Sequence, residues 1–262
     1  MLPQNPVLAA FEKRNVAYGT FIQNNSPENC ELAAGAGLDF VIIDMEHGTF
    51  GIESAANMIR AAESCGAAPF VRIPEASRTT VLKVLDAGAV GIIVPNVESA
   101  EQLREVVAAT RYAPRGTRGA CPCVRSTGHG IVDWETSTAW AEKNIMVGAL
   151  VETKAGIDNF EEIVGVEGLH VVGVGQFDLS MSLGYAGDHK HPEVVRKQAE
   201  MNQLALSHGV DVLGAIFESD AGAIRAGVDR WRGQGARFIA LTGDRFVLAD
   251  AYRGMAAAVG LR

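Results

Sequence analysis

The chain has 262 residues, of which 48% are hydrophobic and 21% are charged. This composition excludes a disordered chain, because disordered sequences lack the apolar content that offsets the entropy cost of folding. The formal net charge of −8 argues against nucleic acid or an anionic membrane as a partner, although a local basic site for a small acid stays possible. With no apolar run long enough for a membrane helix, no signal-peptide pattern and few cysteines, we expect a cytoplasmic protein with reduced thiols.

Eight short apolar runs, rich in β-branched residues, recur along the chain. They predict strands over 18–22, 40–45, 70–73, 91–97, 147–152, 170–175, 212–217 and 238–243. Each run is continuously apolar rather than alternating, which is typical of parallel strands buried on both faces. Helical patterns lie between the runs and begin at residues suited to a helix start, such as Ser26, Ser99 and Pro192.

Strand and helix alternate eight times, which matches a closed (β/α)₈ barrel, the TIM barrel, in both count and length. No linker-like segment divides the chain, so we expect one domain over residues 1–262. An open doubly wound sheet is the alternative, but its glycine fingerprint is absent after the first predicted strand, in GTFIQNNSPEN. The long interruption over 111–134 is rich in Gly, Cys and Arg, and we expect it to lie over the catalytic mouth of the barrel.

Polar residues close several of the predicted strands, where barrel enzymes build their active sites. In chain order they are Asp44, Glu46, His47, Arg72, Glu152, Gln176, Phe177 and Asp178. Glu152 and Asp178 close adjacent strands, and carboxylates are ligands that hard divalent cations prefer. The alternative is that each acid caps the helix that follows it.

His47 lies within three residues of Asp44 and Glu46. It is a candidate general base held by a carboxylate, because the unperturbed pKa of histidine lies near neutrality. A structural histidine at a strand end is the alternative. Arg72 is a candidate for binding a substrate carboxylate or a developing oxyanion, with a salt bridge to Asp44 or Glu46 as the alternative.

Three weaker candidates lie elsewhere. Lys154 follows the fifth predicted strand and has the chemistry for a Schiff base, although a solvated lysine is favoured there. His189 and His191 resemble a metal pair, but His191 precedes a proline at a helix start, which favours a surface cap. Cys121 and Cys123 lack the second cysteine pair that a soft-metal site usually has.

In their order, these residues resemble the HpcH/HpaI aldolase family, the metal-dependent class II pyruvate aldolases. The matching stretches include LAAGAGLDFVIIDMEHG, VLDAGAVGIIVPNVESAEQ, ATRYAPRGTRG, VETKAGIDN and VEGLHVVGVGQFDLSMSLGYAG, and together they cover nearly all of residues 17–195. The resemblance implies a (β/α)₈ barrel that binds Mg²⁺ or Mn²⁺, with Co²⁺ as a further option. It also implies reversible cleavage of a 4-hydroxy-2-oxo acid to pyruvate and an aldehyde.

The resemblance also implies roles for individual residues. Glu152 and Asp178 would be the metal ligands, and the ion would chelate the carboxylate and keto oxygens of pyruvate. Arg72 would contact the keto oxygen and stabilise the enolate. Proton transfer at the 4-hydroxyl would fall to His47, oriented by the matching Asp44.

The metal-held water in that proton transfer would be positioned by Glu46. Gln176 and Phe177 replace the Pro-Ala or Pro-Asn of familiar members, and we expect them to contact substrate beside the metal ligand, with the Phe adding bulk at the acceptor end. Leu150 stands where several members have Gln. The family further implies a homohexamer, a trimer of dimers that exchange their last helix, with Asp86 reaching a neighbouring subunit's mouth.

Two other functions stay open at this point. One is a citrate-lyase-like carbon–carbon lyase acting on an acyl-CoA thioester, which needs a basic groove for the CoA phosphates. The candidates for that groove are Arg111, Arg115, Arg118 and Arg125. The other is a non-catalytic binding barrel, which the intact set of acids, histidine and arginine argues against.

Overall fold

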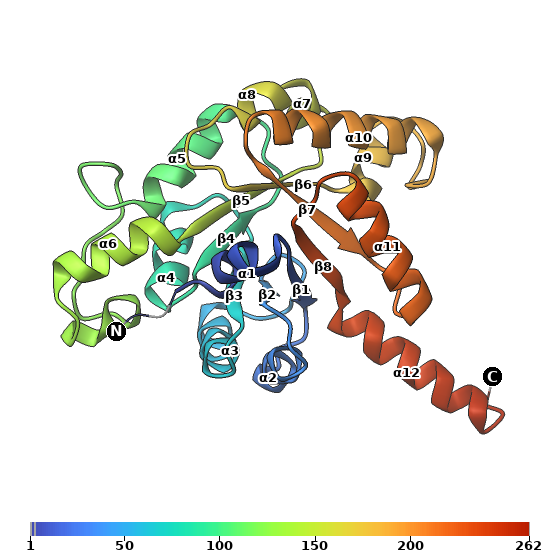
Figure 1. Cartoon of the computed structure of the whole chain (residues 1–262), viewed down its shortest axis with the longest axis horizontal. Coiled ribbons are helices and arrows are strands. Elements are labelled where there is room, and N and C mark those ends of the chain that lie inside the picture. Colours follow the sequence, from blue (N-terminus) through green and yellow to red (C-terminus); the bar gives the residue numbers. More distant parts are fainter. Residues whose placement is uncertain (1, 3, 262) are drawn as a thin grey trace.

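The computed structural model describes residue 2 and residues 4–261 of the chain. Eight parallel strands form one closed barrel in sequence order (Figure 1). They are β1 (Ala17–Ile22), β2 (Phe40–Asp44), β3 (Ala68–Arg72), β4 (Gly91–Val94), β5 (Met146–Val151), β6 (Val171–Val174), β7 (Asp211–Ile216) and β8 (Phe238–Gly243). The predicted (β/α)₈ fold is therefore confirmed, with the ends of each predicted strand shifted only slightly.

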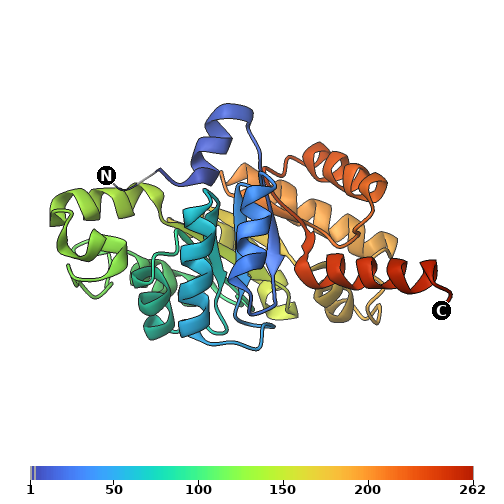
Figure 2. The same ribbon diagram turned by 90° about the horizontal axis from the view of Figure 1, so that it is seen from below.

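Helices surround this barrel (Figures 1 and 2). They are α1 (Pro6–Arg14), α2 (Pro27–Gly35), α3 (Ile52–Ser64), α4 (Arg78–Asp86), α5 (Ala100–Thr110), α6 (Trp134–Asn144), α7 (Lys154–Asp158), α8 (Phe160–Val164), α9 (Gln176–Ser182), α10 (Pro192–Ser207), α11 (Ala221–Gly233) and α12 (Asp244–Ala258), with a 3₁₀ helix η1 (Arg125–Gly130). The expected helix starts are present: the hydroxyl oxygens of Ser26 and Ser99 accept hydrogen bonds from backbone N–H groups of the first turn. Among the described residues, no helix is long and apolar enough to cross a membrane.

Three phenylalanines fill the barrel interior towards the N-terminal ends of the strands, which we call the base. The ring of Phe40 stacks on Phe238 with 4.0 Å between centroids, and Phe70 meets both rings edge-on. Gly19 and Gly91 make room for them, because a Cβ at either glycine would lie within 2.2 Å of a phenylalanine ring. Helix α1, which the sequence analysis did not predict, adds its buried face to this inner cluster. The barrel is therefore closed at the base and open only at the C-terminal strand ends, which we call the mouth.

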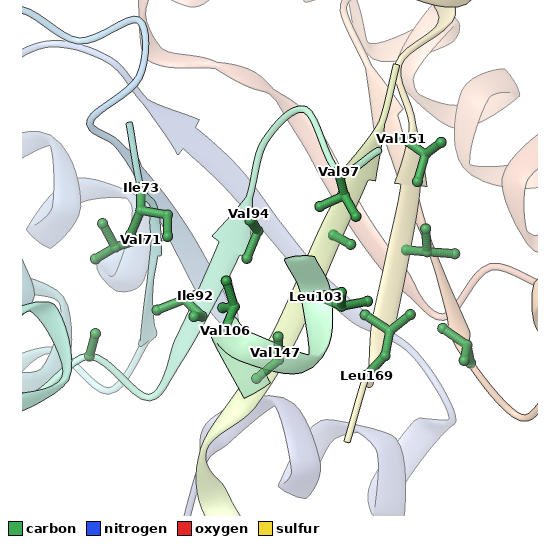
Figure 3. Packing of buried hydrophobic residues seen from close by; sticks show 14 of the residues in the cluster. Val71, Ile73, Ile92, Val94, Val97, Leu103, Val106, Val147, Val151 and Leu169 are labelled. Carbon is green, nitrogen blue, oxygen red and sulfur yellow. The ribbon is translucent and has the colours of Figure 1, made fainter. Parts of the chain in front are cut away.

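The outer faces of the strands pack against the helices in a second apolar layer. Figure 3 shows part of it, where valine, isoleucine and leucine side chains of β3, β4, β5 and α5 gather. Ile92, Leu103 and Val147 are fully buried there. Because each strand is covered on both faces, its sequence is continuously apolar, and the polar residues are displaced to its ends.

The segment over 111–133 lies at the base, so the prediction that it covers the mouth is wrong. It follows α5 rather than a strand, and helices of a barrel run back from the mouth to the base. Its Arg118 contacts Asp86 at the end of α4, with 2.9 Å between Nη2 and Oδ1. Arg125 binds Glu63 near the end of α3. The helix predicted from Ser99 does separate this segment from β4, and its direction places the segment at the base.

Candidate active site at the mouth of the barrel

A cavity of about 240 Å³ opens at the mouth. The predicted residues that line it are His47, Arg72, Glu152, Gln176, Phe177 and Asp178. Asp44 and Glu46 lie behind this lining and contact Arg72. The structure thus brings together the strand-end residues that the sequence singled out.

Arg72 and Asp44 form a buried, two-pronged ion pair. They are register partners at the ends of β3 and β2. Arg72 Nε donates to Asp44 Oδ1 at 2.8 Å and Nη2 donates to Oδ2 at 2.5 Å. Burial acts against both charges, but the mutual hydrogen bonds and attraction outweigh it, so the pKa of Asp44 is lowered and the pKa of Arg72 is raised. Both groups stay ionised, and the guanidinium is fixed at the cavity wall.

Asp44 also organises the turn that follows β2. Its Oδ1 accepts hydrogen bonds from the backbone N–H groups of Glu46 and His47, at 3.1 and 3.2 Å. Asp44 thus contacts His47 through the backbone of this turn. The nearest carboxylate to the His47 ring is Glu46, with 3.8 Å between His47 Nε2 and Oε2. The His47 side chain is 62% exposed, which leaves it accessible to a substrate at the cavity entrance.

Glu46 links three groups at the mouth. Its Oε2 lies 3.2 Å from Arg72 Nη1, and its Oε1 accepts a hydrogen bond from Asn96 Nδ2 at 3.2 Å. The carboxylate is thereby held between the arginine and the histidine. The salt-bridge alternative for Arg72 is confirmed, and the same side chain lines the cavity, where a substrate could reach it.

Glu152 and Asp178 are the paired acids of the site. Burial, then the charge and hydrogen bond of Asp178, raise the pKa of Glu152 to about 7. Its Oε1 is buried and has no hydrogen-bond partner among the described residues. Gly175 leaves space for this side chain, since a Cβ there would lie 2.9 Å from Glu152 Oε2. Two crowded carboxylates with a free oxygen are a donor set that suits a hard divalent cation.

Among the described residues, no three His, Cys, Asp or Glu side chains gather into a ready-made metal site. Glu152 and Asp178 could hold a cation whose remaining ligands come from substrate and water. Such a site keeps open positions, as catalytic metal sites do. The helix-capping alternative does not fit Glu152, since the cap of α7 is the side chain of Thr153.

The apolar part of the cavity lies beside these charges. Its lining includes Phe21, Leu150, Leu213, Phe217 and Phe246. Phe177 adds a ring that is 60% exposed at the rim. Gln176 is held by Gln198, with 2.7 Å between Nε2 and Oε1. The lining of this cavity thus combines charged and apolar side chains.

Several contributors were not found from the sequence. Gln23 Nε2 donates to Asp44 Oδ2 at 2.9 Å, and buried Asp244 accepts from the backbone N–H of Gln23 at 3.0 Å. Thr242 lines the cavity with a backbone φ of 55°, a strained value for a β-branched residue. One feature of the sequence points to Gln23: it directly follows the first predicted strand, and polar residues at strand ends build the mouth of a barrel.

The weaker candidates lie outside the cavity. Lys154 is exposed on α7 and pairs with Asp158 at 2.7 Å, whereas a Schiff-base lysine needs a desolvated environment. His191 caps α10, its Nδ1 accepting from the backbone N–H of Glu193 at 3.3 Å, as the surface-cap interpretation predicts. Asp86 lies at the base in this chain, beside Arg118.

The basic cluster proposed for CoA phosphates is also at the base. Arg111 and Arg118 are buried, and the acids Glu142, Asp86 and Glu63 pair with the cluster. These arginines therefore form no open basic groove beside the cavity at the mouth. The structure therefore removes the one sequence feature that favoured an acyl-CoA substrate.

Several known proteins are similar to this chain in sequence and in fold. The family model HpcH/HpaI aldolase/citrate lyase matches residues 17–251. A hydroxypyruvate/pyruvate aldolase from Roseobacter denitrificans is 32% identical over 97% of both chains. A 2-keto-3-deoxy-L-rhamnonate aldolase from Escherichia coli K12 is 36% identical over 74% of this chain and 73% of its own. The crystal structure of an HpcH/HpaI aldolase from Desulfitobacterium hafniense DCB-2 superposes with a TM-score of 0.87 at 27% identity, covering 96% of this chain and 95% of its own.

The barrel, the acids and arginine at its mouth and these similarities lead to one conclusion. The chain belongs to the HpcH/HpaI aldolase/citrate lyase family, and it is a carbon–carbon lyase of the aldolase class.

Proposed function

We propose that this chain is a divalent-metal-dependent aldolase that reversibly cleaves a 4-hydroxy-2-oxo acid to pyruvate and an aldehyde. The observation that carries the proposal is the pairing of Glu152 and Asp178 beside the buried guanidinium of Arg72 in one cavity. The aldolases named above support the substrate class, because one of them is a pyruvate aldolase and the other a 2-keto-3-deoxy acid aldolase.

Glu152 and Asp178 would hold Mg²⁺, Mn²⁺ or Co²⁺. When bound, such a cation supplies positive charge that stabilises the enolate of pyruvate. Arg72 supplies a second positive centre, fixed before substrate arrives by its ion pair with Asp44. A preorganised guanidinium needs no rearrangement as negative charge develops on the keto oxygen.

His47 is the candidate for proton transfer at the 4-hydroxyl. Its ring lies at the cavity entrance near Glu46, which stabilises the protonated imidazole after it accepts the proton. In the reverse direction the same ring returns the proton to the new alkoxide. Asp44 contributes by fixing the turn that carries His47.

The aromatic region of the cavity would receive the aldehyde portion. Phe177, Phe217 and Phe246 present ring surface beside the charged portion. We therefore expect the aldehyde to carry apolar groups as well as hydroxyl groups. The side-chain amide of Gln176 could form hydrogen bonds with those hydroxyl groups.

A substrate panel tests the reaction. The purified protein is incubated with Mg²⁺ or Mn²⁺ and several 4-hydroxy-2-oxo acids, and pyruvate is detected by a coupled assay. We expect pyruvate and aldehyde in equal amounts without added CoA. Absence of pyruvate from every acid would contradict the proposal. Borohydride in the presence of pyruvate tests the alternative mechanism, in which Lys154 forms a Schiff base. We expect it to trap no adduct on Lys154.

We also propose that the last helix is exchanged between subunits in a homohexamer. Helix α12 points away from the barrel (Figures 1 and 2) and exposes large apolar side chains to solvent: Phe246, Val247, Leu248, Tyr252 and Met255. A neighbouring subunit would cover this face. Because Asp86 lies at the base, any role of this residue at a mouth needs a second copy of the chain.

The solution mass tests this assembly. Light scattering should give the mass of six chains for the full protein, and truncation before Tyr252 should reduce it. An unchanged mass after truncation, or a monomeric full-length protein, would contradict helix exchange.

A further inference from the structure

A second cavity lies at the base, at the opposite end of the barrel from the proposed metal site. It measures about 120 Å³, well above the roughly 10–15 Å³ that one water molecule needs. Its walls include the start of β3, the residues before β4, and helix α6. The polar side chains of the lining include Gln4, Glu63, Tyr112, Arg118, Arg125, Ser126 and Ser137.

Arg118 lines this cavity, and its side chain is fully buried. Its Nη2 donates to Asp86 Oδ1 at 2.9 Å and to Ser126 Oγ at 3.1 Å. Its Nε and Nη1 have no hydrogen-bond partner within the part of the chain that the structure describes. Buried N–H groups of a cation are costly to leave unpaired, so they call for an acceptor.

Two further donors in the same lining lack partners. Arg125 Nε and Ser137 Oγ are buried and unpaired among residues 4–261. The three side chains come from separate elements: Arg118 from the loop after α5, Arg125 from η1, and Ser137 from α6. Arginine has donors and no acceptor. A ligand that satisfies this set must therefore carry several acceptor oxygens.

The charge around the cavity favours an anion among such ligands. Arg118 and Arg125 line the cavity and pair with Asp86 and Glu63. Three more arginines lie close behind them: Arg60 beside Arg125, and Arg111 and Arg115 beside Arg118, with Glu142 as the acid that pairs with the last two. Burial, and then the positive charge of Arg60, lower the pKa of Arg125. Burial, and then Arg115 and Arg118, lower the pKa of Arg111 against the opposing pull of Glu142. A bound negative charge would relieve this repulsion.

We propose that the base cavity is a binding site for a small oxyanion, a phosphate or a carboxylate, held by Arg118, Arg125 and Ser137. Within one chain, this site and the aldolase site at the mouth have no lining residue in common, so anion binding and the aldolase reaction are measured separately. The bound anion neutralises the arginine cluster and joins α6, η1 and the loop after α5, so its binding also stabilises the fold.

Calorimetry on the chelator-treated protein tests the site. Inorganic phosphate and acetate are titrated separately, with sodium chloride holding the ionic strength constant. We expect saturable binding of one anion per chain. The anion that binds more tightly shows whether the natural ligand carries a phosphate or a carboxylate group. Ser137→Ala and Arg125→Lys each remove one donor and should weaken binding about tenfold. Ser207→Ala, a matched change on the exposed end of α10, should leave it unchanged.

A crystal structure with selenate locates the ion directly, and we expect its oxygens on Arg118 Nε or Nη1. Water on these atoms in the presence of saturating selenate would overturn the proposal. So would an affinity that Ser137→Ala and Arg125→Lys leave intact. Loss of binding in Arg72→Lys alone would assign the anion to the mouth and equally contradict the base site.

Discussion

Two arginine–aspartate pairs of nearly the same geometry lie at opposite ends of the barrel. At the mouth, Arg72 donates to Asp44 at 2.8 and 2.5 Å. At the base, Arg237 donates through the same nitrogens to Asp211 at 2.7 and 2.8 Å. Each guanidinium also lies over a phenylalanine ring.

The third nitrogen distinguishes the two pairs. Arg237 Nη1 donates to Asn15 Oδ1 at 3.0 Å, which completes a neutral structural contact. Arg72 Nη1 lies 3.2 Å from Glu46, a second acid, and its side chain forms part of the cavity wall. The pair geometry alone therefore does not identify a catalytic arginine. A catalytic arginine is identified by the end of the barrel at which it lies and by the charges around it.

The largest expected effect is from Arg72→Lys. Lysine keeps the charge but loses the planar fork that holds the guanidinium against Asp44. We expect kcat/KM for pyruvate formation to fall by about 100- to 1000-fold, the usual cost of removing one group that stabilises an oxyanion. Steady-state kinetics on the best acid of the panel measures it.

Arg237→Lys is the matched control at the base. It should leave kcat/KM unchanged while lowering the free energy of unfolding by about 1 kcal/mol. Equal losses of activity in the two variants would remove the distinction between the ends of the barrel.

A buried histidine at the base of the barrel, His170, should make the stability of the protein depend on pH. Burial, and then Arg111, lower the pKa of His170 to about 4, and its Nδ1 accepts from the backbone N–H of Val147 at 3.0 Å. The unfolded chain therefore binds the proton first as pH falls. The stabilisation from neutral His170 is complete above pH ~6.5 and is lost progressively towards pH 4, by up to about 3 kcal/mol.

Denaturant titrations across this pH range, on the wild type and on His170→Gln, measure the difference. The glutamine variant should show a shallower decline in the free energy of unfolding between pH 6.5 and pH 4. Parallel curves for the two proteins would show that His170 does not cause the effect.

The smallest expected effect concerns the acceptor. Phe177→Ala should remove bulk from the rim of the mouth and raise kcat/KM for larger aldehydes relative to smaller ones by about tenfold. Met181→Ala, a change at an exposed residue on the same helix, is the control. Deuterium exchange of the pyruvate methyl group should be unaffected, since Phe177 is assigned to the aldehyde portion. Unaltered aldehyde preference would exclude that assignment.

The fold could be predicted because strand burial is recorded locally in the sequence. Runs such as FVIID and GIIV are apolar on both faces, and the residues that end them are where the mouth is built. The same logic located Arg72, Glu152 and Asp178, whose positions depend on strand ends and not on distant contacts.

The features that were missed depend on three-dimensional packing. Helix α1 closes the base through contacts with the barrel interior, and Gln23 reaches Asp44 across neighbouring strand ends. The misplaced 111–134 segment is a different case, because its location follows from the direction of a helix that the sequence predicts from Ser99. Composition alone marked it as functional and gave no information about which end of the barrel it occupies.

The central claim is that a cation held by Glu152 and Asp178 activates pyruvate. Deuterium exchange of the pyruvate methyl group, followed by NMR, tests it without any choice of aldehyde. The account predicts that a chelator stops the exchange, that Mg²⁺ or Mn²⁺ restores it, and that Glu152→Gln and Asp178→Asn prevent the restoration. Exchange that continues at the same rate in the chelated protein would contradict it.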